Sequence, residues 1–516
     1  MIRNVNQYSF KKDKLVVAAN VSLTNSDGFR DNNEYDRDAY TLLAKYKHSA
    51  SNQTTLFGNL TSLKAFIPSS LSQEDFDNNP SAAAFTWGNV MGFEDYDRFL
   101  VGISHTHGFW EGSEKHRLRL RNITSVFVTN FDSYELRPFN VLAENTTAFG
   151  GRTKFEYTYS KKSILHKYTV GVELFRDNYA WTTTDAPEPD GILLSDNEEV
   201  RDYYNIFAKY EIKHDRFTIS AGLNLNNTEY ELTDLFNQDS TNVSGNFSFP
   251  TQLSPQIGML YKLKGENAIY GTISHGFSPP TLEQTLTPDG QINTDLRPEQ
   301  GWNFEIGSRL QGYKKFSYDI ALFSLRINDL LVAKRIAEDQ SIGINAGRTV
   351  HNGLELFTSY KWINNGSHLF FSDLTYTYSR FRFEEFIDGD DDFSGNKLTG
   401  TPANTVNFVL HYIYKKSFYA NLNYRFVDQM PIRDDNSIFS EAFNVVDLKV
   451  GYKGIFKRAL GGFSLDVHAG VNNLFDEKYA SQLWINAGSF GGNAPRFFYP
   501  GLPINWYGGI KVRYGF

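Results

Sequence analysis

The sequence predicts an all-β protein, specifically a large antiparallel transmembrane β-barrel. Three observations lead to this fold class: the dilution of apolar residues, a period of two along many segments, and the alternation of short and long connections. The chain of 516 residues is 16% aromatic, with 43 Phe and 30 Tyr, yet its mean hydropathy is −0.43. No stretch approaches the roughly 18 to 20 apolar residues of a membrane-spanning helix, which excludes a helical membrane protein.

The last segment of the chain shows the alternation expected of a strand that lies between lipid and water. Charged or small residues on one face alternate with apolar or aromatic residues on the other. The apolar face holds Ile510, Val512, Tyr514 and Phe516, and the polar face holds Lys511, Arg513 and Gly515. Segments 217–225, 418–426 and 463–471 show the same pattern.

Connection lengths distinguish a membrane barrel from a soluble sheet, because outer-membrane barrels have short periplasmic turns and long outer loops. Short connections are predicted at 48–53, 110–116, 160–166, 213–216, 264–267, 311–315, 362–367 and 414–417. Long polar connections are predicted at 65–96, 130–151, 178–200, 231–254, 277–301, 384–402 and 476–503. The alternative fold, a soluble all-β sandwich or propeller, does not require short and long connections to alternate.

Counting back from Phe516, with one strand per gap, predicts about twenty complete strands that begin near Leu15. The last strand must descend to the periplasm, so the strand from Leu15 to Thr24 ascends. Asn4 to Phe10 is then the end of an earlier descending strand, and we expect the chain to begin inside a barrel.

Composition and motifs argue against catalysis and against nucleic-acid binding. The 51 basic and 59 acidic residues provide no basic face, and the absence of Cys removes thiol catalysis, thiolate metal sites and disulfides. No nucleophile elbow, zinc-protease helix or nucleotide-binding glycine loop occurs. We therefore expect neither an enzyme nor a cofactor.

Two features could hold a metal ion, but each has a simpler interpretation. His105 and His107 share one face of a strand, and we interpret them as ordinary histidines of the barrel lumen. The acidic run from Asp388 to Asp392 lacks the glycine and final glutamate of a calcium loop, so we interpret it as a solvated loop tip. A divalent ion shared with lipopolysaccharide is the functional alternative, and we predict no metal site.

Several motifs resemble those of TonB-dependent outer-membrane receptors of the siderophore and ferric-citrate type. The segment "AIYGTISHGFSPP" at Ala268 to Pro280, followed by "LRPEQGWNFEIGSR" at Leu296 to Arg309, resembles the mid-barrel signature of this family. Further matches are "HAGVNNLFDEKYAS" at His468 to Ser481, "DGFRDNNEYDR" at Asp27 to Arg37 and "IPSSLSQEDFDNNPSAAAFTWG" at Ile67 to Gly88. Tyr514 and Phe516 resemble the terminal aromatic signal for barrel insertion.

The resemblance implies a 22-stranded barrel filled by an N-terminal plug, of which residues 1–516 would supply about twenty strands. Nothing in the sequence corresponds to the plug, to the box that contacts TonB or to the first strand. A gene fragment, a misplaced start codon or a partial chain is therefore expected. The resemblance also places the protein in the outer membrane of a Gram-negative bacterium as a multi-pass β-barrel.

The implied function is a receptor and transporter for an iron complex, energised by TonB in intact members of the family. The implied partners are the iron chelate, outer-membrane lipid and lipopolysaccharide, the barrel-assembly machinery, and the TonB complex only if the plug and box are present. The alternatives are a passive pore or a receptor for cobalamin, another metal chelate or an oligosaccharide. A soluble all-β enzyme or lectin is the third hypothesis.

Ligand-binding candidates follow from the chemistry of iron chelates, which are commonly anionic. Arginine can pair with carboxylate or catecholate oxygens, and tryptophan and tyrosine offer flat contact area. Each candidate has an alternative role, as a girdle aromatic residue or as a loop salt-bridge partner. The candidates are Arg30, Trp87, Tyr96, Arg98, Trp181, Arg297, Arg433 and Trp484.

Overall fold

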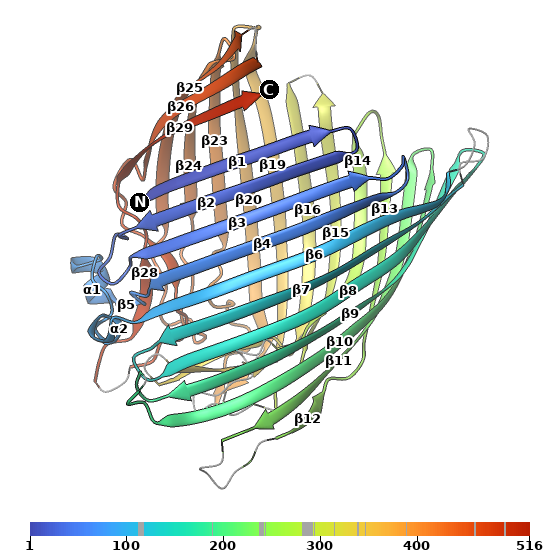
Figure 1. The fold of residues 1–516 in the computed structure, drawn as a ribbon. Coiled ribbons are helices and arrows are strands. Elements are labelled where there is room, and N and C mark those ends of the chain that lie inside the picture. Colours follow the sequence, from blue (N-terminus) through green and yellow to red (C-terminus); the bar gives the residue numbers. More distant parts are fainter. Residues whose placement is uncertain are drawn as a thin grey trace.

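The computed structural model describes residues 1–111, 118–187, 189–236, 242, 244–280, 293, 295–313, 315–337, 340–345, 347–388, 390–458, 461–489 and 492–515. In this part of the chain one antiparallel sheet of 22 strands curves round on itself (Figure 1). The strands are β1 (Ile2–Lys12), β2 (Leu15–Ser26), β3 (Tyr35–Lys47), β4 (Gln53–Phe66), β6 (Phe93–Glu111), β7 (Arg119–Leu136), β8 (Val141–Lys161), β9 (Ile164–Thr184), β10 (Leu193–His214), β11 (Phe217–Asp234), β12 (Gly245–Ser248), β13 (Gln252–Lys262), β14 (Ala268–Ser278), β15 (Glu299–Tyr313), β16 (Phe316–Asn328), β19 (Arg348–Asn364), β20 (His368–Glu385), β23 (Asn404–Tyr414), β24 (Phe418–Val427), β25 (Phe443–Arg458), β26 (Gly461–Asn472) and β29 (Asn505–Gly515).

The strand count agrees with the sequence prediction. β12 and β13 pair with successive parts of β11 and share one position, so the described sheet has 21 positions, twenty of them from β2 onward. β1 is the predicted earlier descending strand. With an odd number of positions, β1 and β29 run in the same direction, and no pairing joins them among the described residues.

The alternation of side chains gives the sheet an apolar outer face and a polar inner face. On β29 the outward residues Trp506 and Ile510 are 75% and 73% exposed, whereas Lys511 and Arg513 lie on the inner face. Large exposed apolar side chains of this kind recur around the sheet, as at Leu223 on β11. A face of this composition is suited to lipid and would aggregate in water.

Three of the predicted long loops are much shorter than expected, and the strands beside them are longer. Only residues 137–140 separate β7 from β8, where the prediction was a loop at 130–151. Similarly, β9 and β10 reach into 178–200, and β11 and β12 reach into 231–254. Above the lipid the outward side chains become polar while the backbone ladder continues, so the apolar alternation ends before the strand does.

The long connections carry smaller elements: β5 (Leu71–Ser72), α1 (Gln73–Asn78), α2 (Phe85–Val90), β17 (Leu331–Ala337), β18 (Gln340–Asn345), β21 (Ile387–Asp388), β22 (Asp391–Asp392), β27 (Ala480–Leu483) and β28 (Arg496–Pro500). Neither described helix is long and apolar enough to cross a membrane.

A layer of packed loops links the two ends of the sheet. β5, from the connection after β4, forms a three-stranded sheet with β28 and β27, from the connection after β26. Lys478 donates to the carbonyl of Asp77, and Arg496 donates to the hydroxyl of Thr86. We call this assembly the loop layer. Its buried core consists of Leu71, Phe76, Ile432, Ala487, Phe497 and Phe498.

Candidate functional site

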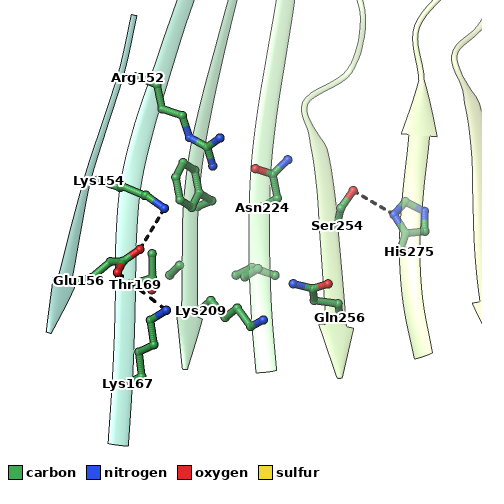
Figure 2. A pocket seen from close by; sticks show the side chains of 13 residues that line it. Arg152, Lys154, Glu156, Lys167, Thr169, Lys209, Asn224, Ser254, Gln256 and His275 are labelled. Carbon is green, nitrogen blue, oxygen red and sulfur yellow. Dashed lines mark hydrogen bonds and ion pairs between the residues drawn. The ribbon is translucent and has the colours of Figure 1, made fainter. Parts of the chain in front are cut away.

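The inner face of β7 to β14 carries a groove that we call the inner-wall groove. Its lower part, toward the short turns, has a volume of about 440 Å³ and is lined by charged and amide side chains (Figure 2). Its upper part, toward the long loops, has a volume of about 700 Å³ and is lined by aromatic rings and arginines. Arg152 lines both parts and joins them into one surface.

The lower part contains more cations than carboxylates. Arg152, Lys154, Lys167 and Lys209 project from three neighbouring strands, and Glu156 is the one acidic residue that lines it (Figure 2). Such a surface, with amides and hydroxyls beside the cations, can bind carboxylate or phosphate oxygens.

Glu156 is shared among several cations. Its carboxylate, 6% exposed, lies 2.9 Å from Lys154 Nζ and 3.8 Å from Lys167 Nζ, and it accepts a 2.7 Å hydrogen bond from Arg121 Nε. Because one carboxylate serves three cations, these cations retain an excess of positive charge toward the lumen.

The upper part combines flat aromatic surfaces with two arginines, Arg152 and Arg201. Arg152 lies 3.7 Å from Glu173 and stacks over the ring of Phe207 at 4.7 Å. Arg201 pairs with Asp177 and lies over the ring of Phe175. Planar cations on aromatic faces keep part of their donor capacity available to a ligand.

Glycine on a neighbouring strand allows the aromatic rings to lie against the wall. A Cβ atom at Gly171 would lie 2.4 Å from Cζ of Phe207 and 2.8 Å from the carbonyl of Thr153. At Gly150 it would lie 2.3 Å from the ring of Phe127. The two glycines therefore fix ring positions that form the floor of the groove.

Three candidates from the sequence lie on the wall of the barrel. Tyr96 and Arg98 face the lumen on β6, and the Tyr96 ring packs 5.2 Å from Phe131. Trp181, 1% exposed, stacks on Tyr179 at 4.8 Å near the upper end of β9. Arg98 is exposed to the lumen, whereas Trp181 is almost completely buried.

Three other candidates hold the loop layer together. Arg30 is buried and donates to the carbonyls of Ser69 at 2.7 Å, Ala82 at 2.9 Å and Pro68 at 3.2 Å. Burial lowers the pKa of Arg30 to about 10. Trp87 is buried in α2 against Gly92, and Trp484 packs on the core of the loop layer.

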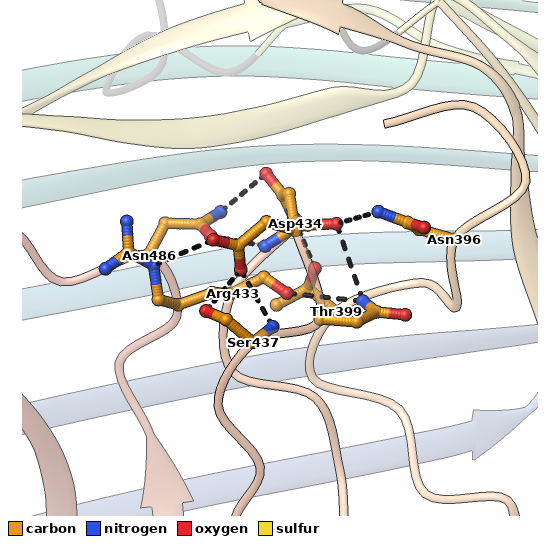
Figure 3. A network of polar contacts seen from close by, with 8 residues as sticks. Asn396, Thr399, Arg433, Asp434, Ser437 and Asn486 are labelled. Carbon is orange, nitrogen blue, oxygen red and sulfur yellow. Dashed lines mark hydrogen bonds and ion pairs between the residues drawn. The ribbon is translucent and has the colours of Figure 1, made fainter. Parts of the chain in front are cut away.

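The last two arginine candidates lie in separate loops. Arg297 forms a 2.8 Å ion pair with Asp329, and Arg433 lies 3.8 Å from Asp435. The adjacent Asp434 accepts hydrogen bonds from the Thr399 hydroxyl and the Asn486 amide, as Figure 3 shows. Burial raises the pKa of Asp434 despite these two donors. The ligand-binding role of all eight candidates stays a prediction.

The two histidines are not lumen residues, contrary to the sequence interpretation. His105 pairs across the ladder with Thr54, on the outward face of β6 in line with the exposed Val101 and Ile103. His107 packs edge-on against Phe109 at 4.6 Å. The prediction that both histidines share one face of the strand is correct. Two polar residues on one face do not reveal, however, whether that face is the lumen or the lipid side.

The structure also describes most of the acidic run and one of the two C-terminal aromatic residues. Asp388, Asp391 and Asp392 lie in the small hairpin of β21 and β22. Tyr514 is on the outward face of β29, and Phe516 lies outside the described residues. The described residues contain no group of three or more His, Asp or Glu arranged to hold a metal ion.

Sequence reasoning missed the cations of the inner-wall groove. Arg152 and Lys154 stand two apart within an alternating segment, which places them on one face. Their proximity to Lys209 depends on the register of β8, β9 and β10, which no local pattern reveals.

The sequence profile described as "TonB dependent receptor-like, beta-barrel" matches residues 15–474. The chain belongs to this family. This confirms the resemblance seen in the sequence motifs, and it identifies the protein as a TonB-dependent receptor barrel of the outer membrane.

Three of the proteins similar to this chain are named for iron complexes. The ferrioxamine receptor of Yersinia enterocolitica is 26% identical over 300 residues, which span 58% of this chain but only 37% of that protein. The ferric citrate transporter FecA superposes with a TM-score of 0.79 at 16% identity, covering 99% of this chain and 76% of FecA. The ferric yersiniabactin uptake receptor FyuA from Yersinia pestis has a TM-score of 0.75 at 12% identity, covering 100% and 78%. At these identities the two solved structures establish the shared fold.

Proposed function

We propose that this receptor barrel binds and imports an anionic iron complex across the outer membrane. The observation that carries the proposal is the excess of cations over carboxylates in the inner-wall groove. Iron chelates present carboxylate or catecholate oxygens, which arginine and lysine bind by charge-assisted hydrogen bonds. The ferrioxamine receptor among the relatives supports iron as the cargo.

The proposal includes the partners expected from the sequence. A plug in the lumen would gate passage and receive energy from the TonB complex, and the barrel-assembly machinery would insert the sheet. Capture would begin at the lumen-facing Arg98 and Tyr96 and at loop candidates such as Arg433, before cargo reaches the inner-wall groove.

Chelate titration of the purified chain in detergent tests the proposal. Ferric citrate and a ferric catecholate are the probes, tryptophan fluorescence is the readout, and cobalamin and a neutral oligosaccharide serve as uncharged competitors. The groove variant Arg152→Gln/Lys209→Gln should bind the iron chelates about tenfold more weakly. The matched control, Lys64→Gln/Arg176→Gln, removes the same charge from the outer face and should bind them like the wild type.

Two outcomes would overturn the proposal. Equal chelate affinity in the groove variant and the wild type would show that the groove cations do not contribute to cargo binding. Absence of chelate binding, together with a large ungated current in planar bilayers, would identify a passive pore instead.

A further inference from the structure

A small pocket lies on the inner face of the sheet at its short-turn end, next to the inner-wall groove. It has a volume of about 220 Å³ and lies where the connection between β3 and β4 meets β6 and β7. We call it the short-turn pocket. Its polar lining consists of Ser51, Gln53, Thr106, Arg119 and Arg121.

The backbone around the short-turn pocket holds its walls in place. The N–H group of Gly108 donates to Oδ1 of Asn52 at 2.9 Å, which ties the turn after β3 to β6. A Cβ atom at Gly108 would lie 2.6 Å from the Cβ atom of Ser51, so glycine allows the turn to approach this closely. The register of β6 and β7 shifts between Gly108 and Trp110, and such β-bulges are common beside binding sites.

Two arginines from β7 supply the positive charge. Arg119 and Arg121 are two residues apart in the strand, so both side chains leave the inner face, from backbone positions about 7 Å apart. Arg121 donates to the carboxylate of Glu156 through Nε, at 2.7 Å, and through Nη2. Its other terminal nitrogen, Nη1, stays available to a ligand.

The charge around the pocket is not balanced by the protein. None of the described residues that line it is acidic. Glu111 is aligned with Arg119 across the ladder, and Glu156 is already shared by Arg121 and two lysines of the groove. Counted by position, four cations stand against two acidic residues. Arg119 is exposed and forms no ion pair with a side chain that the structure describes.

Neutral hydrogen-bonding groups complete the lining. Gln53 and Thr106 are aligned across the ladder of β4 and β6, and Ser51 adds a second hydroxyl group from the turn. Hydroxyl and amide groups beside guanidinium groups form a set of donors that point to one anion from several directions. The volume is below the roughly 300 Å³ at which pockets for larger ligands begin, so the pocket suits a small anion rather than an iron chelate.

We propose that the short-turn pocket binds a small tetrahedral oxyanion of the phosphate class. Phosphate presents oxygens in four directions, so the two arginines can bind one side of it while the hydroxyl and amide groups bind the other. A planar carboxylate has only two oxygens and would leave part of this donor set unused. The site opens toward the periplasm, where the short turns lie, and it does not depend on chelate binding in the inner-wall groove.

Phosphate titration of the full chain in detergent tests the proposal. The starting protein is the groove variant Arg152→Gln/Lys209→Gln, which weakens any binding of phosphate to the groove itself. Calorimetry in phosphate-free buffer should show saturable binding of one phosphate per chain. Adding Arg119→Gln to this variant should weaken phosphate binding about tenfold.

Controls separate a built site from general attraction by lumen cations. Lys511→Gln/Arg513→Gln, made in the same starting protein, removes two cations with the same spacing on the inner face of β29 and should leave phosphate affinity unchanged. Arg119→Lys keeps the charge but loses the two-donor geometry, so it should bind phosphate with intermediate affinity. Thr106→Val removes one hydroxyl group and should weaken binding several-fold.

Four results would overturn the proposal: no saturable phosphate binding, undiminished affinity after Arg119→Gln, an equal loss in the β29 control, or acetate bound as tightly as phosphate. Heat-modifiable migration on gels shows whether each variant is folded. If the Arg119→Gln protein is not folded, Thr106→Val carries the test, and unchanged phosphate affinity in that variant would refute the assignment.

Discussion

Replacing Glu156 by Gln tests whether the inner-wall groove is held together by one shared carboxylate. The carboxylate is 6% exposed, and Arg121, Lys154 and Lys167 around it are 29% to 39% exposed. Exposed ion pairs contribute about 0 to 1 kcal/mol, and breaking a fully buried pair costs about 3 to 5 kcal/mol. With one partner buried and three half-exposed, and with the 3.8 Å contact weak, we expect a loss of about 2 kcal/mol in the free energy of unfolding.

The assay is urea unfolding of the barrel refolded in detergent micelles, followed by tryptophan fluorescence and gel migration. Asp95→Asn is the matched control, because Asp95 and its partner Lys64 are both about 45% exposed, and we expect it to cost about 0.5 kcal/mol or less. Equal unfolding free energies for the two variants would refute the shared-carboxylate reasoning. A second readout is independent of folding: Glu156→Gln leaves three cations unopposed, so ferric citrate should bind more tightly and with a steeper salt dependence.

Three further predictions concern single positions. Gly171→Ala forces the Phe207 ring off the wall and should destabilise the barrel by about 1 to 3 kcal/mol, whereas Gly58→Ala, with open space around its Cβ, should be neutral in the same urea assay. Burial raises the pKa of Asp434 above its unfolded value of 3.8, so the stability linked to its protonation is fully present below pH 3.8 and is lost as pH rises through the folded pKa. Its loop should therefore become more sensitive to protease at neutral than at mildly acidic pH, and an unchanged pH profile in Asp434→Asn would contradict this. Arg30→Lys cannot reach three carbonyls at once and should make the first long loop protease-sensitive while leaving the sheet's urea midpoint unchanged; a lowered midpoint would contradict the local role.

The sequence predicts the barrel well because lipid contact imposes the same alternation on every strand. Segment 217–225 shows it plainly, and the structure places its apolar members on the exposed outer face of β11. The limits of the strands are predicted less well. Between β7 and β8 the outward residues turn polar while the ladder continues to Leu136 and resumes at Val141, so hydropathy reports the edge of the lipid rather than the end of the strand.

The candidate site is harder to predict, because residue type does not determine burial. Arg30 and Trp181 have the chemistry of ligand-binding residues, yet the structure shows both covered by their own chain. The groove cations were missed for the converse reason. Lys209 and Lys167 are ordinary polar members of separate strands, and only the antiparallel register of β8, β9 and β10 places them in one groove with Glu156.

The loop layer has a consequence for the order of folding. Its contacts join residues such as Lys478 and Asp77, which are 401 positions apart in the chain, so closing this loop carries a high entropy cost unless the intervening strands have already paired. Neighbouring hairpins have low contact order and can zip together first. The loop layer therefore assembles last, because its contacts form only after the sheet has curved far enough to bring its two ends together. Acquired protease resistance at β5 and β28 would mark the slowest phase of refolding.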